Sequence, residues 1–312
     1  MAVVKGAKVS GQSGGGATEE GVSRYLLMDI FALSKPRVTF MVLVATVVGY
    51  VLASRGAVDW IHLAGVLLGT LMVDWGIMAV NQYMERDTDK LMARTKDRPL
   101  PAGRMKPRRV LVLAVCVSAA GVLLLALWAN LLTGLLGLMV VVTYVVCYTP
   151  LKRHSGLNTL VGAVPGALPP VLGWAAVHGS IGREALALFL ILFIWQPPHF
   201  LAIAYLYRDE YARAGLSMLP VVDPSGRVTS RQLIVYSATL IPISMYPSMI
   251  GMTGALYFFG ALMLSMFFFA AALAMALRTE EGTARVLFKV SVFYLPILFA
   301  LMIYDATGTV NG

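Results

Sequence analysis

The sequence predicts an all-α protein that crosses a membrane several times. The 312 residues are 58% hydrophobic and only 13% charged, whereas ordinary soluble domains carry about 25% charged residues. The mean hydropathy is +0.76. From residue 38 onward, apolar stretches long enough to cross a hydrocarbon core of about 30 Å alternate with short polar segments. This pattern excludes a disordered chain and disfavours a soluble globular enzyme.

The chain divides into a polar N-terminal segment and one membrane domain. Residues 1–34 contain the small, polar stretch SGQSGGGATEEG and predict a disordered cytoplasmic tail. Residues 35–312 predict a single membrane domain. Its nine apolar spans are 38–53, 63–80, 110–129, 131–148, 159–177, 185–206, 233–250, 252–277 and 286–304.

Two of the apolar runs are too long for one crossing and have to be divided. The run 110–148 has 39 residues, which is close to 60 Å at about 1.5 Å per helical residue. It therefore predicts two helices, with the hairpin at Ala129–Asn130. The run 233–277 predicts a second division near Gly251.

The distribution of positive charge predicts the orientation of the bundle. The chain has a net charge of +9, and 23 of its 25 Lys and Arg residues fall in segments that nine spans place on one side. Only Arg55 and Arg183 fall on the other side. Cytoplasmic segments carry the excess of Lys and Arg, so we expect a bundle of nine transmembrane helices in the cytoplasmic (inner) membrane. Its N-terminus would be cytoplasmic and its C-terminus outside. Since topology accounts for the charge, no nucleic-acid partner is expected.

Acidic side chains interrupt the basic segment that follows the second span. Asn81, Glu85 and Asp89 are spaced i, i+4, i+8, so on a helix they share one face at the inner end of the span. Oxygen ligands in this arrangement suit Mg²⁺, which usually binds a few carboxylates together with substrate phosphates. Arg94 and Arg98 follow and are placed to bind diphosphate oxygens. The alternative is a helix end with solvated mixed charges.

The next inner segment offers further phosphate contacts. It carries Lys152 and Arg153, directly after Tyr148 at the end of the fourth span. Tyr148 is a candidate for a hydrogen bond or for a cation–π contact with a developing carbocation. The alternative reading of the two basic residues is that they only orient the helix.

A second acidic pair lies on the same predicted side of the membrane. Asp209 and Glu210 stand between Arg208 and Tyr211. Two acidic clusters near basic residues predict a site for a diphosphate bound by Mg²⁺, with its apolar tail in the bilayer. A transporter or channel would more often bury its acids at the midplane.

Two polar side chains inside the spans, His199 and Asp74, each have two possible roles. His199 lies beside Pro197–Pro198, which we expect to break the helix. It either contacts a substrate or a porphyrin iron, or donates to a carbonyl freed near that break. Asp74 faces the bundle interior and either lines the pocket or pairs with another helix.

The small residues of the fifth span, with Gly162, Gly166 and Gly173, predict close helix packing or a wall that admits a flat acceptor.

The motifs as a set resemble a known family. Asn81-xxx-Glu85-xxx-Asp89, followed by RTKDRPLPAG, resembles the first aspartate-rich motif of the membrane-embedded (UbiA-type) prenyltransferases. The resemblance implies nine transmembrane helices, a Mg²⁺-dependent diphosphate site on the cytoplasmic side and a cavity open to lipid. It also implies that the metal ligands come from Asn81, Glu85, Asp89, Asp209 and Glu210.

Four other stretches resemble the subfamily of these enzymes that farnesylates heme. They are YTPLKR, GALPPVLGW, WQPPHF and YRDEYARAGLSMLPVV. This implies transfer of a farnesyl group from farnesyl diphosphate to a vinyl group of heme b, with addition of water, to give heme O for terminal oxidases. The implied partners are farnesyl diphosphate, heme b and membrane lipid, with heme-pathway or oxidase-assembly proteins as further candidates.

The sequence departs from the family pattern at two acids. Glu85 stands where the first motif usually has Asp, and Glu210 stands where we expect Asp before the tyrosine. Relatives that prenylate small aromatic compounds carry a DxxxD second motif, whereas here Tyr207 and Tyr211 hold that spacing. A prenyltransferase for another acceptor, such as a quinone precursor or a chlorin, remains the alternative function.

Overall fold

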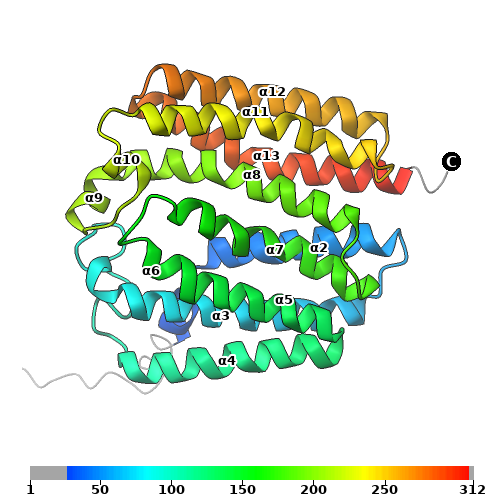
Figure 1. The fold of residues 1–312 in the computed structure, drawn as a ribbon. Helices are drawn as coiled ribbons and strands as arrows, with labels where there is room; N and C mark the ends of the chain where they lie inside the picture. The colour runs from blue at the N-terminus through cyan, green and yellow to red at the C-terminus, as the bar shows by residue number, and fades with distance from the viewer. Residues whose placement is uncertain (1–26, 309–312) are drawn as a thin grey trace, which may run out of the picture.

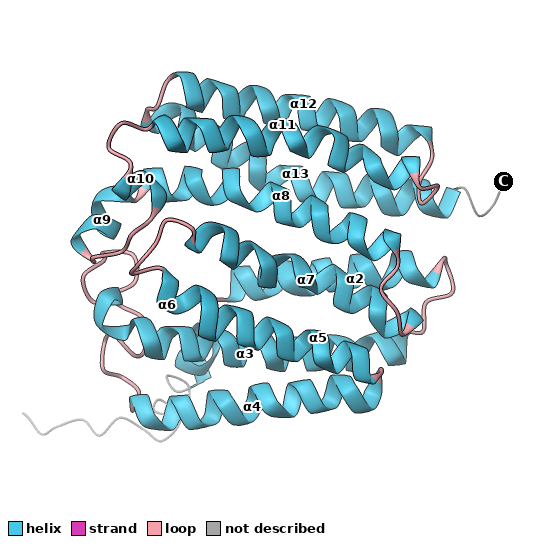
Figure 2. Cartoon of the chain, in the orientation of Figure 1, coloured by secondary structure: helices cyan, strands magenta, loops and turns pink. Residues whose placement is uncertain are grey.

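A computed structural model describes residues 27–308, and every regular element within them is a helix (Figure 2). The long helices run side by side as one bundle, with short helices and loops at its two ends (Figure 1). This confirms the predicted all-α class. The elements are α2 Pro36–Ser54, α3 Trp60–Asp89, α4 Pro107–Trp128, α5 Leu131–Val142, the π-helix η1 Thr143–Tyr148, α6 Thr149–Leu151, α7 Asn158–His178, α8 Arg183–Leu206, α9 Arg208–Arg213, α10 Leu219–Val222, α11 Arg227–Met249, α12 Ala255–Leu277 and α13 Glu281–Gly308.

Eight helical segments of the described residues are long and apolar enough to cross a membrane. One of them is the continuous rod Leu131–Leu151, formed by α5, η1 and α6. The chain is therefore a multi-pass membrane protein. The remaining predicted span, 233–250, lies in α11, whose first two turns (residues 227–232) are largely polar and shorten its apolar stretch. Nine crossings therefore stay a prediction.

Both predicted divisions of the long apolar runs lie where the structure turns. Helix α4 ends at Trp128, and Asn130 caps α5 by accepting a hydrogen bond from the backbone N–H of Thr133 at 2.9 Å. The Asn130 amide also donates to the carbonyl of Ala175 at 2.8 Å, which ties this hairpin to α7. Gly251 has a φ of 75° between α11 and α12, a conformation that favours glycine.

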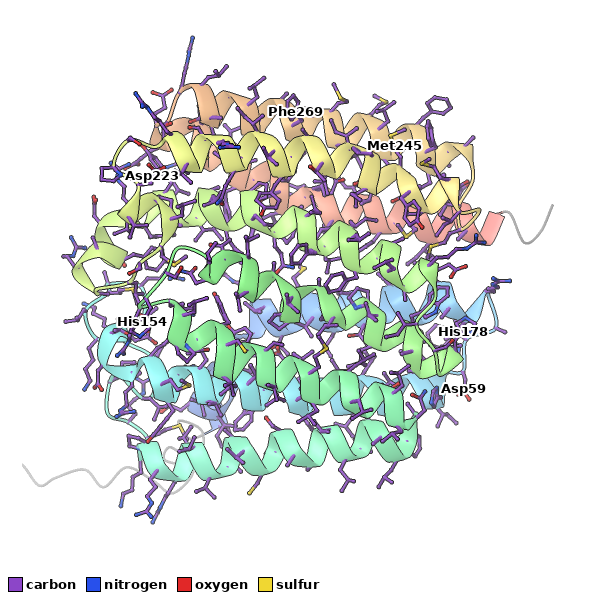
Figure 3. All side chains as sticks on the ribbon, in the orientation of Figure 1. Asp59, His154, His178, Asp223, Met245 and Phe269 are labelled. Atoms are coloured by element: carbon purple, nitrogen blue, oxygen red, sulfur yellow. The ribbon has the colours of Figure 1, made fainter. Side chains whose placement is uncertain are left out.

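The connections between helices alternate between two ends of the bundle (Figure 1). We call one end the basic end: it holds the α3–α4, α6–α7, α8–α11 and α12–α13 connections. His154 and Asp223 lie at this end, whereas Asp59 and His178 lie at the opposite one (Figure 3). The segments predicted to be cytoplasmic thus gather at the basic end. Which side of the membrane this end faces stays a prediction.

The predicted disordered tail is wrong for residues 27–34. Residues 27–33 are helical and pack against α3, with Leu33 fully buried. The indole N–H of Trp75 donates to the carbonyl of Ile30 at 3.0 Å, and the amide of Gln82 donates to that of Ala32 at 3.1 Å. These tertiary contacts order a segment whose own sequence gives no clear periodicity. Residues 1–26 of the predicted tail lie outside the described part of the chain.

Helices α2 and α7 approach each other closely at two glycines. A Cβ added to Gly49 would lie 1.9 Å from the carbonyl oxygen of Pro170, and one added to Gly173 would lie 2.1 Å from that of Thr46. Backbone meets backbone at both points, so no side chain can move away. This confirms close packing as the role of Gly173.

We expect Gly173→Ala to lower the free energy of unfolding by about 1–3 kcal/mol, the usual cost of overpacking. The two backbones would have to separate to admit the methyl group. Gly282→Ala is the matched control, because Gly282 also lies in a helix but has no atom within 4 Å of the added Cβ. Denaturant unfolding in mixed micelles measures both, and an equal loss in the two variants would contradict the role of the α2–α7 contact.

Candidate diphosphate site at the basic end

The last turns of α3 carry the three side chains of the first predicted cluster. Asn81, Glu85 and Asp89 lie on one face of the helix, and Asn81 and Asp89 are buried. The side chain of Glu85 is only 12% exposed. Buried carboxylates are costly unless they are paired, so their partners define the site.

Each of the three side chains contacts a cation from a different segment. The ammonium of Lys152, after α6, donates to Glu85 at 2.7 Å. The guanidinium of Arg98, in the α3–α4 connection, donates to Asp89 at 2.8 Å. The ammonium of Lys35, before α2, donates to Asn81 Oδ1. Three cations thus converge on one row of oxygen ligands, which is the composition of an anion site that also takes a metal ion.

Lys35 is the site residue that the sequence analysis missed, since it was counted only as an orienting charge. It precedes Pro36 at the start of α2 with a φ of 51°, a left-handed conformation that is uncommon for lysine. Burial and the positive charges of Arg98 and Lys152 lower the pKa of Lys35 to about 7, and Glu85 and Asp89 oppose that shift. The signal in the sequence was a lysine directly before a helix-starting proline at the membrane edge.

Asp74, which precedes Asn81 on α3, connects this helix to the start of α2. Its side chain is buried and accepts a hydrogen bond from the hydroxyl of Thr39, one turn after Lys35. Of the two interpretations left open for Asp74, the structure supports pairing with another helix. The contact fixes the N-terminal turn of α2, and with it Lys35, relative to Asn81.

Tyr148 faces the same group of charges from the π-helix η1. The Lys152 ammonium lies 4.5 Å from the centroid of its ring. The ring meets Tyr144 edge-on at 5.0 Å and packs on Gly162, where an added Cβ would lie 2.6 Å from it. Burial opposes the charged form of Lys152, but Glu85 and the two tyrosines outweigh it and raise the Lys152 pKa.

Arg153 reaches the site through a small cavity at the basic end. The cavity has a volume of about 220 Å³ and is lined by Met84, Glu85, Thr149, Pro150, Arg153, His154 and Leu216. Arg153 is exposed to solvent and lies on the same opening as Glu85. It is therefore positioned to meet an anion that enters there.

The second predicted cluster lies on the short helix α9, at the same end of the bundle as the first cluster (Figure 1). The guanidinium of Arg94, in the α3–α4 connection, donates to the hydroxyl of Tyr211 at 3.3 Å. The same group lies 5.1 Å from the centroid of the Tyr207 ring. Arg94 thus joins the two acidic segments at the basic end.

The two acids of α9 differ in their surroundings. Asp209 is 81% exposed and, among the described residues, pairs with its neighbour Arg208 alone, at 3.6 Å. Arg208 itself lies over the ring of Tyr205, at 4.5 Å. In contrast, Glu210 has one carboxylate oxygen that is buried and lacks a hydrogen-bond partner among the described residues. Such an atom is costly unless it binds a cation or a donor.

The donor set fits Mg²⁺ with substrate oxygens completing its coordination. Within residues 27–308, no group of three acidic, His or Cys side chains is close enough to hold a metal ion alone. Mg²⁺ commonly takes only one or two carboxylates and binds substrate phosphates and water for the rest. Glu85, Asp89 and the partnerless oxygen of Glu210 supply such carboxylates, and Asn81 supplies an amide oxygen.

His199 lies apart from this site, between α8 and α13. Helix α8 continues through Pro197 and Pro198, so the predicted break is wrong. His199 contacts the hydroxyl of Ser291 at 2.6 Å, and not a freed carbonyl. The neighbouring Gln196 donates to the carbonyls of Ala163 and Leu192 at 3.0 and 3.1 Å, which accounts for this polar group in the core.

Comparison with known proteins identifies the family of the chain. The model of the UbiA prenyltransferase family matches residues 42–297. A protoheme IX farnesyltransferase of Solibacter usitatus is 42% identical over 291 residues, covering 90% of this chain and all of the relative. One of Koribacter versatilis is 44% identical over 293 residues, covering 90% of this chain and 94% of the relative.

Solved structures share the fold at low sequence identity. A digeranylgeranylglyceryl phosphate synthase has a TM-score of 0.75 at 15% identity, covering 90% of this chain and 99% of that one. A UbiA homolog from Archaeoglobus fulgidus, bound to DMAPP and Mg²⁺, has a TM-score of 0.63 at 18% identity, covering 88% and 99%. At these identities the likeness concerns the fold of the bundle.

Proposed function

Because the chain belongs to the UbiA prenyltransferase family, we propose that it transfers a farnesyl group from farnesyl diphosphate to a vinyl group of heme b. Water adds in the same reaction, and the product is heme O. The observation that carries the choice of donor and acceptor is the 42–44% identity to protoheme IX farnesyltransferases over 90% of the chain. The paired acidic and basic side chains at the basic end support the diphosphate chemistry.

At the basic end, one set of residues binds the metal ion and another set binds the diphosphate oxygens. Asn81, Glu85 and Asp89 of the first cluster and Glu210 of the second are the residues that would bind Mg²⁺ together with diphosphate oxygens, and Asp209 is set aside because it is exposed to solvent. Mg²⁺, when bound, supplies Lewis-acid charge that neutralises the leaving diphosphate. The surrounding cations bind the remaining diphosphate oxygens with charge-assisted hydrogen bonds. They are Lys35, Arg94, Arg98, Lys152 and Arg153.

Charge neutralisation promotes ionisation of the allylic C–O bond, whose electron pair leaves with the diphosphate. The bundle excludes water from the resulting farnesyl cation, and the ring of Tyr148 stabilises it. The π electrons of the heme vinyl group then form the new C–C bond. A water molecule captures the cation left beside the porphyrin and loses a proton, giving the hydroxyethylfarnesyl group.

Mass analysis of products tests this function. Membranes containing the protein are incubated with heme b, farnesyl diphosphate and Mg²⁺. We expect a heme product that is heavier than heme b by farnesyl plus water. Modification of a chlorin or a quinone precursor in place of heme would overturn the acceptor. A chain that releases no diphosphate from farnesyl diphosphate would not be a prenyltransferase.

The contribution of Lys35 is tested by Lys35→Gln. We expect the KM for farnesyl diphosphate to rise about 10- to 100-fold, because a hydrogen bond to a charged group contributes about 1.5–3 kcal/mol. Arg37→Gln is the control, since Arg37 is two residues away and exposed. Steady-state kinetics at varied farnesyl diphosphate measure both variants, and equal KM values for Lys35→Gln and wild type would remove Lys35 from the site.

A further inference from the structure

The hydrogen bonds around His199 determine which of its two ring nitrogens carries the proton. The side chain lies on α8 seven residues before Leu206, which places it roughly 10 Å from the basic end of that helix. His199 Nδ1 is 2.6 Å from the Ser291 hydroxyl oxygen. That hydroxyl oxygen is in turn 2.7 Å from the carbonyl oxygen of Phe288. Both contacts are hydrogen bonds, so each needs its own proton.

Only one placement of the protons keeps the His199 imidazole neutral and still gives each of the two hydrogen bonds its own proton. The carbonyl of Phe288 can only accept, so the single proton of Ser291 must point to it. The proton between His199 and Ser291 then comes from the imidazole, as Nδ1–H. A charged imidazolium would also satisfy both contacts, but burial at this depth disfavours the charge. His199 is therefore the Nδ1–H tautomer, and its Nε2 carries a lone pair.

Aromatic rings hold the imidazole in this orientation. Trp195 stacks on it with centroids 4.5 Å apart and planes at 20°, and Phe288 lies 5.5 Å away at 29°. The Trp195 indole N–H donates to the Ser291 carbonyl at 3.1 Å, which fixes that ring too. A rotation of the imidazole that exchanged its two nitrogens would break the hydrogen bond to Ser291. The packed rings of Trp195 and Phe288 oppose such a rotation.

The lone pair on Nε2 remains accessible. No described residue bonds to this nitrogen, and it is not among the atoms that the protein buries without a partner. Of the other three histidines of the chain, His62 and His178 lie toward the end opposite the basic end, and His154 is exposed. Helix α13, which carries Ser291, packs against both α8 and α2.

We propose that Ser291 is a positioning residue that holds His199 as the Nδ1–H tautomer, and that His199 Nε2 binds the iron of the heme acceptor. This rests on the proposed function, since heme b is the acceptor there. A neutral imidazole whose second nitrogen donates to a fixed partner is the usual form of a metal-ligating histidine. Ligation would hold the porphyrin at the depth where the farnesyl chain enters the bilayer.

The first test concerns the tautomer and needs no heme. ¹⁵N NMR of the full chain in micelles, labelled at histidine, reports which nitrogen is protonated, and His199→Gln assigns the signal. We expect Nδ1–H in the wild type and a mixture of tautomers in Ser291→Ala. Ser237→Ala is the control, because that buried hydroxyl bonds only within its own helix. A wild-type His199 protonated on Nε2 would overturn the inference.

The second test titrates the full chain with heme b alone, without farnesyl diphosphate. We expect His199→Gln to bind heme at least 10-fold more weakly and to lose the iron–histidine band in the resonance Raman spectrum. Added imidazole should restore that band, and His62→Gln should leave it unchanged. Ser291→Ala should weaken binding less and shift the band, whereas Ser291→Thr should restore it.

The outcomes separate the two proposals. If the wild type makes heme O but His199→Gln keeps the wild-type heme spectrum, the iron contact is wrong and the function stands. If the wild type shows the His199-dependent spectrum but forms no heme O, the site stands and the proposed reaction is wrong.

Discussion

Asp89→Asn is expected to lower the rate of heme farnesylation by about 10²–10³-fold, the usual loss when one preorganised electrostatic contact to the reacting charge is removed. The carboxylate of Asp89 is almost fully buried and accepts from Arg98 at 2.8 Å. The amide keeps the shape but removes the negative charge that would hold Mg²⁺, and it leaves Arg98 without its anion. The measurement is kcat at saturating farnesyl diphosphate and heme b, with Mg²⁺ varied in parallel.

Asp87→Asn is the matched control for this variant. Asp87 lies two residues earlier on the other side of α3, is 64% exposed and pairs with Lys90 at 3.3 Å. Exposed pairs of this kind contribute about 1 kcal/mol or less, so its turnover should stay close to wild type. Near-normal turnover of Asp89→Asn would rule out Asp89 as a metal ligand.

Glu210→Gln is expected to lower kcat by about two orders of magnitude, and Asp209→Asn to lower it by less than about fivefold. The difference follows from one atom: an oxygen of Glu210 is buried without a partner, while Asp209 is exposed beside Arg208. A glutamine would bring an amide where we infer that a cation binds. Single-turnover product analysis of the two variants measures the effect on the chemical step.

The two variants of α9 control for each other, because each removes one negative charge from adjacent positions. Circular dichroism and thermal unfolding of both should match the wild type. A larger loss in Asp209→Asn than in Glu210→Gln would reverse the assignment and place Asp209 at the metal.

Much of the fold could be predicted because each feature is local in the sequence. Apolar stretches of sufficient length indicate membrane helices, and the i, i+4 spacing of Asn81, Glu85 and Asp89 places them on one helical face wherever the helix lies. The hairpin at Ala129–Asn130 could be predicted for the same reason, because the apolar run 110–148 is too long for one crossing. For α11 the polar first turns obscured the length of the span.

The features that sequence reasoning missed depend on contacts between distant segments. Lys35 meets Asn81 only because α2 packs against α3, and Ser291 meets His199 across 92 positions of the chain. The choice between Asp209 and Glu210 depends on how the short helix α9 is rotated, and six residues give no periodicity to read. The predicted break at Pro197 is wrong because membrane helices tolerate proline where the freed carbonyls find other donors; beside it, the Gln196 amide donates to the α8 carbonyl of Leu192.

The contact between Arg94 and Tyr211 spans 117 positions, and this has a consequence for how the protein is made. During synthesis the N-terminal part of a chain emerges first, so α3 and its acidic face exist well before α9. A half-made bundle therefore lacks Glu210 and the two tyrosines that contact Arg94. Ionisation of an allylic diphosphate in such an open, wet intermediate would only waste substrate as alcohol. Because the ligands are divided between α3 and α9, the chain gains reactivity only after α9 has been made and has packed beside the end of α3.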